Sequence, residues 1–331
     1  MPACSEEGTV SAVSSSGNAI NLMEKEVNAL STSTRLSQVL ATSKTITFDE
    51  GSRIVIMSDC HRGNSSWGDN FSGNQNLFFA ALYYYYENGY TYIELGDGDE
   101  LWENRNIDDI ISAHSDAFWL MSLFYQDHRL FMLYGNHDIV KRDSRYTQTK
   151  CHSFYCDSTD SKIPLFPDIE IMEGLILKYR NTNNQIFLTH GHQGDFLNDT
   201  LWKLSRFLVR YLWRPLELVG IKDPISTSKN NKKKNAVEKN LMDFARENSQ
   251  MLICGHTHRP VFPKVGEVPY FNDGSCVHPR CITALEIRGG TISLVKWAVM
   301  TKPDRSLYVG REILESPVRL NDYFRTLMSA D

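Results

Sequence analysis

Five short apolar segments each end directly in a cluster of Asp, Asn or His, and this repetition constrains the fold more than any other feature of the chain. The first three are Arg53–Ser58, Thr91–Leu95 and Arg129–Leu133, separated by helix-like stretches at 74–88 and 107–124. Strands that alternate with helices favour a largely parallel sheet. The polar clusters then meet at the carboxyl edge of that sheet, where open α/β sheets form their sites.

The second half of the chain continues the series with shorter connections. Further strand-like segments lie near Leu175–Tyr179, Gln185–Thr189, Met251–Cys254, Cys281–Ile287, Thr291–Ala298 and Leu307–Ile313. Short connections indicate more antiparallel pairing, because parallel strands need a longer crossover. We therefore expect a second sheet, formed by these later strands and packed on the first.

Three segments flank or interrupt this series. Residues 1–44 are expected to be an N-terminal extension, partly disordered because its first 18 residues are rich in Ser, Gly and Ala, with short helices at 21–42. Residues 316–331 are expected to form a C-terminal helix after a main domain at 45–315. An aromatic, apolar and basic stretch begins the interval 196–248, a polar loop follows at 229–234, and the pattern then turns helical. This interval predicts an inserted helical cap.

Composition sets outer limits on the function. The 331 residues are 41% hydrophobic and 23% charged, which excludes wholesale disorder, and the net charge of −5 gives no case for specific nucleic-acid binding. The seven cysteines favour free thiols in a reducing compartment, with Cys151–Cys156 and Cys276–Cys281 as alternative pairs under oxidation. Neither a signal peptide nor a membrane span is predicted, so we expect a cytoplasmic protein.

The polar clusters hold the side chains that bind divalent metal ions. Six of the ten histidines lie in four of the clusters, beside Asp59, Asp97 and Asn136. One histidine at a strand end is usually structural, but five strand ends that all supply carboxylate, amide or imidazole groups indicate a site for Mn²⁺, Fe²⁺ or Zn²⁺. Two such ions can neutralise a phosphate and hold a bridging hydroxide as the nucleophile. Asp97 is the natural shared ligand, because it is central in the order of the clusters.

The ordered clusters resemble the motifs of the calcineurin-like metallophosphoesterases. They read Ser58-Asp59-Cys60-His61, Gly96-Asp97-Gly98-Asp99-Glu100, Gly135-Asn136-His137-Asp138, Thr189-His190-Gly191-His192 and Gly255-His256-Thr257-His258, over about 53–260. The resemblance implies a four-layer α/β/β/α sandwich. It implies one metal ion on Asp59, His61 and His258, a second on Asn136, His190 and His256, and Asp97 between them. It also implies His137 as the residue that stabilises the transition state or protonates the leaving oxygen, oriented by Asp138.

Two stretches resemble one branch of that family more closely. Leu95–Trp102 and Gly255–Pro260 are similar to the UDP-2,3-diacylglucosamine pyrophosphatase branch, whose members also carry a helical cap, although that branch typically has Arg where His137 stands. The function expected from the resemblance is hydrolysis of phosphodiester or pyrophosphate bonds with two metal ions, chiefly Mn²⁺. The alternatives are a phosphomonoesterase or phosphoprotein phosphatase, and a non-catalytic metal-binding scaffold.

The cap carries a local positive charge. Residues 201–239 contain ten basic and three acidic side chains, a net +7, so the rest of the chain carries −12. Its arginines, with Arg206 and Arg210 in one helical stripe, are expected either to grip a small or lipid-linked phosphate or to form a solvated face; peripheral membrane contact is a third interpretation. Arg62 and Arg259, each next to a ligand histidine, either contact the substrate or form ion pairs. The sequence leaves the oligomeric state open.

Overall fold

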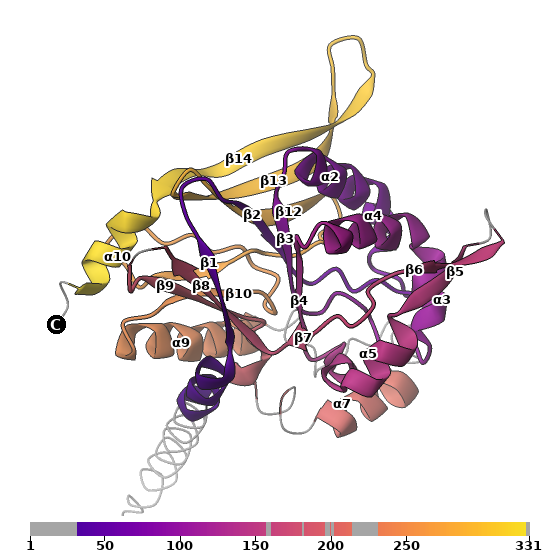
Figure 1. Ribbon diagram of the computed structural model, residues 1–331, viewed down its shortest axis with the longest axis horizontal. Helices are drawn as coiled ribbons and strands as arrows, with labels where there is room; N and C mark the ends of the chain where they lie inside the picture. The colour runs from indigo at the N-terminus through magenta and orange to yellow at the C-terminus, as the bar shows by residue number, and fades with distance from the viewer. Residues whose placement is uncertain are drawn as a thin grey trace, which may run out of the picture.

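The computed structural model describes residues 32–156, 160–180, 182–195, 199, 202–213 and 231–328. Its larger sheet has seven strands in the order β14-β13-β12-β2-β3-β4-β7 (Figure 1). The parallel half consists of β2 (Arg53–Met57), β3 (Thr91–Leu95), β4 (Leu130–Leu133) and β7 (Ile171–Met172). The antiparallel half consists of β12 (Cys281–Arg288), β13 (Thr291–Thr301) and β14 (Leu307–Arg319), and β12 pairs with β2.

The second sheet has five strands in the order β1-β8-β9-β10-β11. They are β1 (Lys44–Phe48), β8 (Gly174–Tyr179), β9 (Gln185–Thr189), β10 (Met251–Cys254) and β11 (Tyr270–Asn272). Only β8 and β9 pair antiparallel, and the other neighbours are parallel. The expectation that the later strands form the second sheet is therefore only half right, because β12–β14 extend the first sheet instead.

Helices cover the outer face of each sheet, which confirms the four-layer α/β/β/α sandwich. The helices α2 (Gln75–Glu87), α3 (Ile107–Ala113) and α4 (Ser115–Gln126) pack on the seven-stranded sheet. The helix α9 (Asn231–Glu247) and the helical residues 32–42 pack on the five-stranded sheet. Between the sheets lies a second apolar layer with Ile56 and Leu95 from one sheet and Leu188 and Ile253 from the other.

The predicted cap is smaller than the interval 196–248. Val237, Leu241 and Phe244 of α9 are buried against Phe187 and Leu252 of the five-stranded sheet, so α9 is a layer of the sandwich. That helix begins at Asn231, inside the segment expected to be a polar loop. The described part of the cap is α7 (Trp202–Leu208) with the π-helical turn η4 (Val209–Trp213). Residues 214–230 lie outside the described residues.

The C-terminal helix starts later than expected. Strand β14 continues through Pro317 to Arg319, which an edge strand allows because one row of its N–H groups faces solvent. Helix α10 then runs Leu320–Met328 and buries Tyr323 and Phe324 between the sheets. The prediction for residues 1–18 lies outside the described residues.

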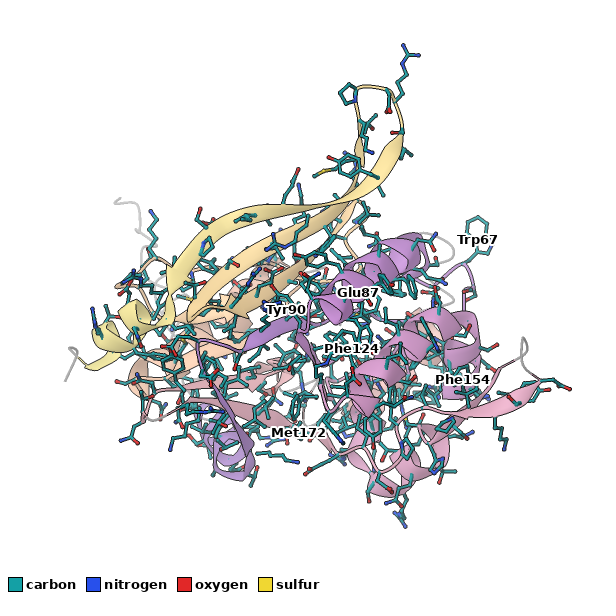
Figure 2. All side chains as sticks on the ribbon, turned by 45° about the horizontal axis from the view of Figure 1, so that its top comes forward. Trp67, Glu87, Tyr90, Phe124, Phe154 and Met172 are labelled. Atoms are coloured by element: carbon teal, nitrogen blue, oxygen red, sulfur yellow. The ribbon has the colours of Figure 1, made fainter. Side chains whose placement is uncertain are left out.

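Smaller elements complete the chain. They are η1 (Ser72–Asn74), η2 (Ile139–Arg142), α5 (Ser144–Lys150), β5 (Ser153–Cys156), β6 (Ser161–Pro164) and η3 (His192–Gly194). Side chains fill the layers densely, whereas Trp67 stands fully exposed on the loop after β2 (Figure 2). Within the described ranges no helix combines the length and apolar character that a membrane span requires, and Cys60, Cys151, Cys254, Cys276 and Cys281 are free thiols.

Candidate metal centre

The five polar clusters meet at the carboxyl ends of β2, β3, β4, β9 and β10, as the sequence predicts. Five of their residues adopt left-handed backbone conformations, with φ between 46° and 66°: Asp59, His61, Asp97, His256 and His258. Such φ values are uncommon for residues other than glycine and cluster at functional sites. Asp59 N and His61 N donate to the carbonyls of Gly96 and Asp97, so the first two cluster loops hold each other.

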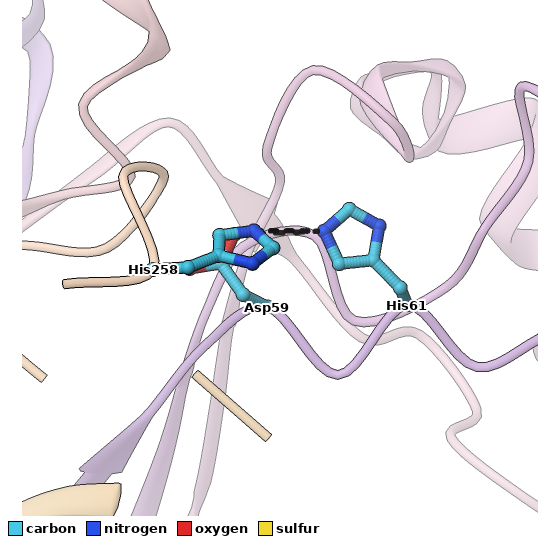
Figure 3. A group of neighbouring side chains, drawn as sticks. All are labelled: Asp59, His61 and His258. Carbon is cyan, nitrogen blue, oxygen red and sulfur yellow. Dashed lines mark hydrogen bonds and ion pairs between the residues drawn. The ribbon is translucent and has the colours of Figure 1, made fainter. Parts of the chain in front are cut away.

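Asp59, His61 and His258 form the first donor group (Figure 3). Asp59 Oδ1 lies 2.9 Å from Nε2 of His258 and 3.6 Å from Nε2 of His61, and these two ring nitrogens are 3.3 Å apart. The other carboxylate oxygen, Oδ2, accepts from Ser58 Oγ at 2.6 Å and from the His256 backbone N at 2.8 Å. One oxygen of Asp59 is thus fixed by hydrogen bonds while the other faces the two imidazoles.

Asp97, His190 and His256 form the second donor group. Asp97 Oδ2 lies 3.2 Å from Nε2 of His190 and 3.7 Å from Nε2 of His61, so this carboxylate faces both groups. The adjacent Gly135 is required for this approach, because a Cβ there would overlap the Asp97 carboxylate.

Divalent metal ions fit these side chains. Four polar atoms of residues that the sequence assigns to metal ligation are buried and have no hydrogen-bond partner: Asp59 Oδ1, Asn136 Oδ1, His190 Nε2 and His256 Nε2. Buried polar atoms normally have a partner. The donor set of carboxylate, amide oxygen and imidazole also suits borderline divalent ions.

The two carboxylates are held ionised by the surrounding imidazoles. Burial alone would raise the pKa of Asp97, yet His190 and His137 hold that pKa well below its usual range. Burial acts on Asp59 in the same direction, and His258 and His190 likewise lower the pKa of its carboxyl group. Both groups are therefore anionic across the physiological pH range.

The imidazoles of the second group differ from one another in pKa. For His190, burial favours the neutral ring, but the carboxylates of Asp97 and Asp59 raise its pKa to about 9. For His256, burial and then the neighbouring charge on His190 lower the pKa to about 4. Without metal, this group therefore carries its proton on His190.

His137 is held by Glu100 and Trp102. Its Nδ1 lies 2.7 Å from Glu100 Oε2, and its ring stacks on Trp102 with centroids 4.4 Å apart and an interplanar angle of 21°. Glu100 also contacts Nδ1 of His61 at 2.9 Å. These contacts leave Nε2 as the ring nitrogen of His137 that can transfer a proton.

The prediction that Asp138 orients His137 is wrong. Its carboxylate accepts from the backbone N of Gly135 at 2.7 Å and of Gly98 at 3.2 Å, and from Lys141 Nζ at 2.9 Å. Asp138 therefore fixes the loops around Asp97, and Glu100 makes the orienting contact. The sequence alone does not show whether Asp138 or Glu100 contacts His137. In the structure, the turn that follows Asp97 places Glu100 against the His137 ring.

The family model of calcineurin-like phosphoesterases matches residues 52–260. The chain belongs to this family. A comparison with curated proteins gave no match, whereas 11 chains of solved structures match. One is Vps29 from Chaetomium thermophilum, at 10% identity and a TM-score of 0.33, with 80% of this chain and 98% of that chain covered.

Arg62 forms ion pairs, which is one of the two alternatives that the sequence leaves open. It is fully buried, with Nη1 2.7 Å from Glu94 Oε2 and Nε 2.7 Å from Asp99 Oδ1. Lys141 adds a second buried cation, 2.6 Å from Asp99 Oδ2. Burial alone would raise the pKa of Asp99, but Arg62 and Lys141 lower it to about 2. Arg62 is therefore part of a buried ion-pair network with Glu94 and Asp99.

The other three arginines proposed for substrate binding have protein partners. Arg259 pairs with Glu238 of α9, and Arg206 lies with its guanidinium 4.9 Å over the ring of Trp202. Arg210 donates to backbone carbonyls of the loop after Asp97. Substrate binding by these three arginines stays a prediction, as does membrane contact through the cap.

Sequence reasoning missed several residues around the centre. Glu94 and Lys141 complete the buried ionic network, and Asp273 Oδ1 lies 2.7 Å from Ser58 Oγ, the hydroxyl that contacts Asp59. Burial, followed by the charge of Asp59, raises the pKa of Asp273 well above its usual range. A charged residue inside an apolar strand, as Glu94 is, was the available signal for a buried ion pair.

Proposed function

We propose that the protein is a hydrolase of phosphodiester or pyrophosphate bonds that uses two divalent metal ions. The observation that carries the proposal is the presence of two adjacent donor groups, Asp59/His61/His258 and Asp97/His190/His256. The carboxylate of Asp97 lies near His61 of the first group and His190 of the second. Bound there, two ions would neutralise the charge of a phosphate and lower the pKa of water. We propose Mn²⁺, with Fe²⁺ and Zn²⁺ as alternatives.

The protein side chains have separate roles in this proposal. One ion would be held by Asp59, His61 and His258, the other by Asn136, His190 and His256, and both by Asp97. The oxygen of a water molecule forms a new bond to phosphorus while the bond to the leaving oxygen breaks. The leaving oxygen takes a proton from Nε2 of His137, and the attacking water releases a proton to solvent. The ring of His137 then takes up one proton from solvent, so the enzyme neither gains nor loses a proton over the cycle.

The arrangement of His137 favours an enzyme over a non-catalytic scaffold. A non-catalytic scaffold needs no proton donor. Here Glu100 holds Nδ1 of the His137 ring and Trp102 stacks on the face of that ring. The cap supports the choice of diesters and pyrophosphates, because η4 packs on the loop that carries Glu100 and Trp102 and would supply a second surface for a substrate with two substituents. Arg206 keeps its proposed role in binding the anionic substrate.

The test is metal-dependent hydrolysis by the full-length protein. After chelation and reloading with Mn²⁺, Fe²⁺ or Zn²⁺, kcat/KM would be measured on bis(p-nitrophenyl) phosphate, p-nitrophenyl phosphate and a dinucleoside pyrophosphate. We expect hydrolysis only after reloading, with a preference of about tenfold or more for diester or pyrophosphate over monoester, roughly 1.4 kcal/mol in the transition state. A monoester preference of that size would instead indicate a phosphatase.

A further inference from the structure

Arg210 of the cap is hydrogen-bonded to the loop that follows Asp97. Arg210 Nε donates to the carbonyl of Trp102 at 2.8 Å, and Nη2 donates to those of Leu101 at 2.7 Å and Asn104 at 3.2 Å. A single guanidinium thus satisfies three carbonyls of one turn, which its planar set of five N–H donors allows.

Tyr211, the next residue of the cap, contacts the same loop. Its hydroxyl accepts from Arg105 Nη2 at 2.7 Å, and the guanidinium of Arg105 lies 5.6 Å from the centre of its ring. Arg210 and Tyr211 both belong to the π-helical turn η4. Such turns are rare and occur frequently at functional sites, and here the turn marks the place where the cap docks.

The docked loop carries the two side chains that hold His137. Glu100 contacts Nδ1 of the ring, and Trp102 stacks on its face. The backbone N of Trp102 also donates to Glu100 Oε1 at 3.2 Å, and the Trp102 side chain is 2% exposed. A displacement of the 101–104 turn would therefore move both supports of His137 together.

The cap also contacts the segment that follows His137 in the chain. The guanidinium of Arg142, in the η2 turn after the His137 motif, lies 5.6 Å from the ring centre of Trp202 at the start of α7. The cap therefore contacts both the loop that supports the ring of His137 and the segment that follows His137.

We propose that Arg210 is a positioning residue for His137. It holds the 101–104 turn so that Glu100 and Trp102 place the imidazole for transfer of a proton to the leaving oxygen. This inference rests on the proposed function. It assigns to the cap a role in the chemical step, because a misplacement of about 1 Å in a catalytic group can cost about 100-fold in rate.

The leaving group separates this role from a general structural one. A p-nitrophenolate leaving group needs little protonation, whereas an aliphatic alkoxide needs a proton from His137. We expect Arg210→Ala to lower kcat on a phosphodiester with an aliphatic leaving group about 10- to 100-fold more than on its p-nitrophenyl counterpart. Metal content and KM should stay near those of the wild type.

Two comparisons make the experiment specific. Lys203→Ala, at an exposed position of the adjoining helix α7, is the matched control and should change neither rate. Arg210→Ala in a His137→Ala background should cause no further loss, because residues that act as one unit are non-additive. If Arg210→Ala does not fold, Arg210→Lys supports the same comparison, because lysine cannot reach three carbonyls with a planar fork.

A measurement on the metal-free protein does not depend on turnover. The ring signals of His137, assigned by their loss in His137→Gln, should shift or broaden in ¹H–¹⁵N spectra of Arg210→Ala and stay unchanged in Lys203→Ala. Equal losses on both diesters, or an unchanged His137 signal, would overturn the role of Arg210. A metal-replete wild type that hydrolyses neither the diesters nor a dinucleoside pyrophosphate would overturn the proposed function, and this inference with it.

Discussion

The residues of the centre combine strained backbone with opposed charges. Asp59 and Asp97 adopt left-handed φ values of 51° and 49°, and each carboxylate faces at least two imidazoles. Such conformations cost about 1–3 kcal/mol each and persist only where the surroundings determine them. Mutual hydrogen bonds between the loops, such as His61 N to Asp97 O at 2.9 Å, supply that constraint.

The pKa of His190, about 9, predicts how metal affinity depends on pH. Below that pH a proton occupies the ring and competes with the metal ion, and above it the competition ends. Apparent affinity at the Asn136/His190/His256 position should therefore rise about tenfold per pH unit from 6.5 to 8.5, with release of about one proton. Calorimetry in buffers of different ionisation enthalpy measures this release, and an affinity independent of pH would contradict the assignment.

Substitutions of Asp97 and His137 should separate metal binding from the transfer of the proton. Asp97→Asn removes the charge that faces both donor groups, so metal content and activity should fall together. His137→Ala should keep both ions and lose about 10²–10⁴ in kcat. Elemental analysis beside turnover checks both, and a metal-replete His137→Ala protein with wild-type turnover would refute the role of this ring.

At the scale of elements, a buried ionic network joins the loops below the centre. Arg62 follows β2, Glu94 lies within β3, Asp99 follows β3, and Asp138 and Lys141 follow β4. The network contains three acids and two bases, all nearly inaccessible to solvent. It fixes the spacing between three strand ends, which the metal ligands on the same loops require.

Removal of Lys141 from this network should be costly. Lys141→Met leaves Asp99 and Asp138 with one cation fewer, and breaking a buried pair costs about 3–5 kcal/mol. We expect a loss of that size in urea unfolding, together with weaker metal binding. Arg145→Met, at an exposed position four residues later, should stay within about 0.5 kcal/mol of the wild type.

The sequence predicted the elements with a strong pattern and missed those without one. Strands β2, β3, β4, β9 and β10 were predictable because each is an apolar run that ends in polar residues. The two residues of β7 and the three of β11 carry no period at all. Helix α9 was predicted as a helix but assigned to the cap, because an amphipathic pattern shows that one face is buried and not what it is buried against.

At the scale of the whole molecule, the sandwich is closed by the C-terminal helix. Leu320, Tyr323 and Phe324 of α10 are buried in the apolar layer between the sheets, and Tyr323 Oη donates to the carbonyl of Pro263. This role was not predictable, because the sequence places a short helix at the chain end without indicating where it packs. The helix covers one end of this apolar layer, and most of the strands that it helps to cover lie far from it in the sequence.

Truncation of one α10 side chain should therefore destabilise the whole domain. Phe324→Ala removes a buried aromatic ring, for which losses of about 3–5 kcal/mol are typical. We expect that loss in the free energy of unfolding, with kcat per folded molecule unchanged. Asn321→Ala, on the exposed face of the same helix, should have little effect, and an equal loss in both variants would show that the burial of Phe324 is not the cause.

Strand β2 lies in the middle of its sheet, between β3 and β12, and this position orders events during synthesis. Asp59 leaves the ribosome early, but the partner strand on one side of β2, and the histidine that completes its donor group, are made about 200 residues later. Until then the growing chain has an open strand edge and lacks His256 and His258 of the proposed ligands. We expect nascent chains that end before His256 to retain no metal, so that metallation follows translation and does not guide it.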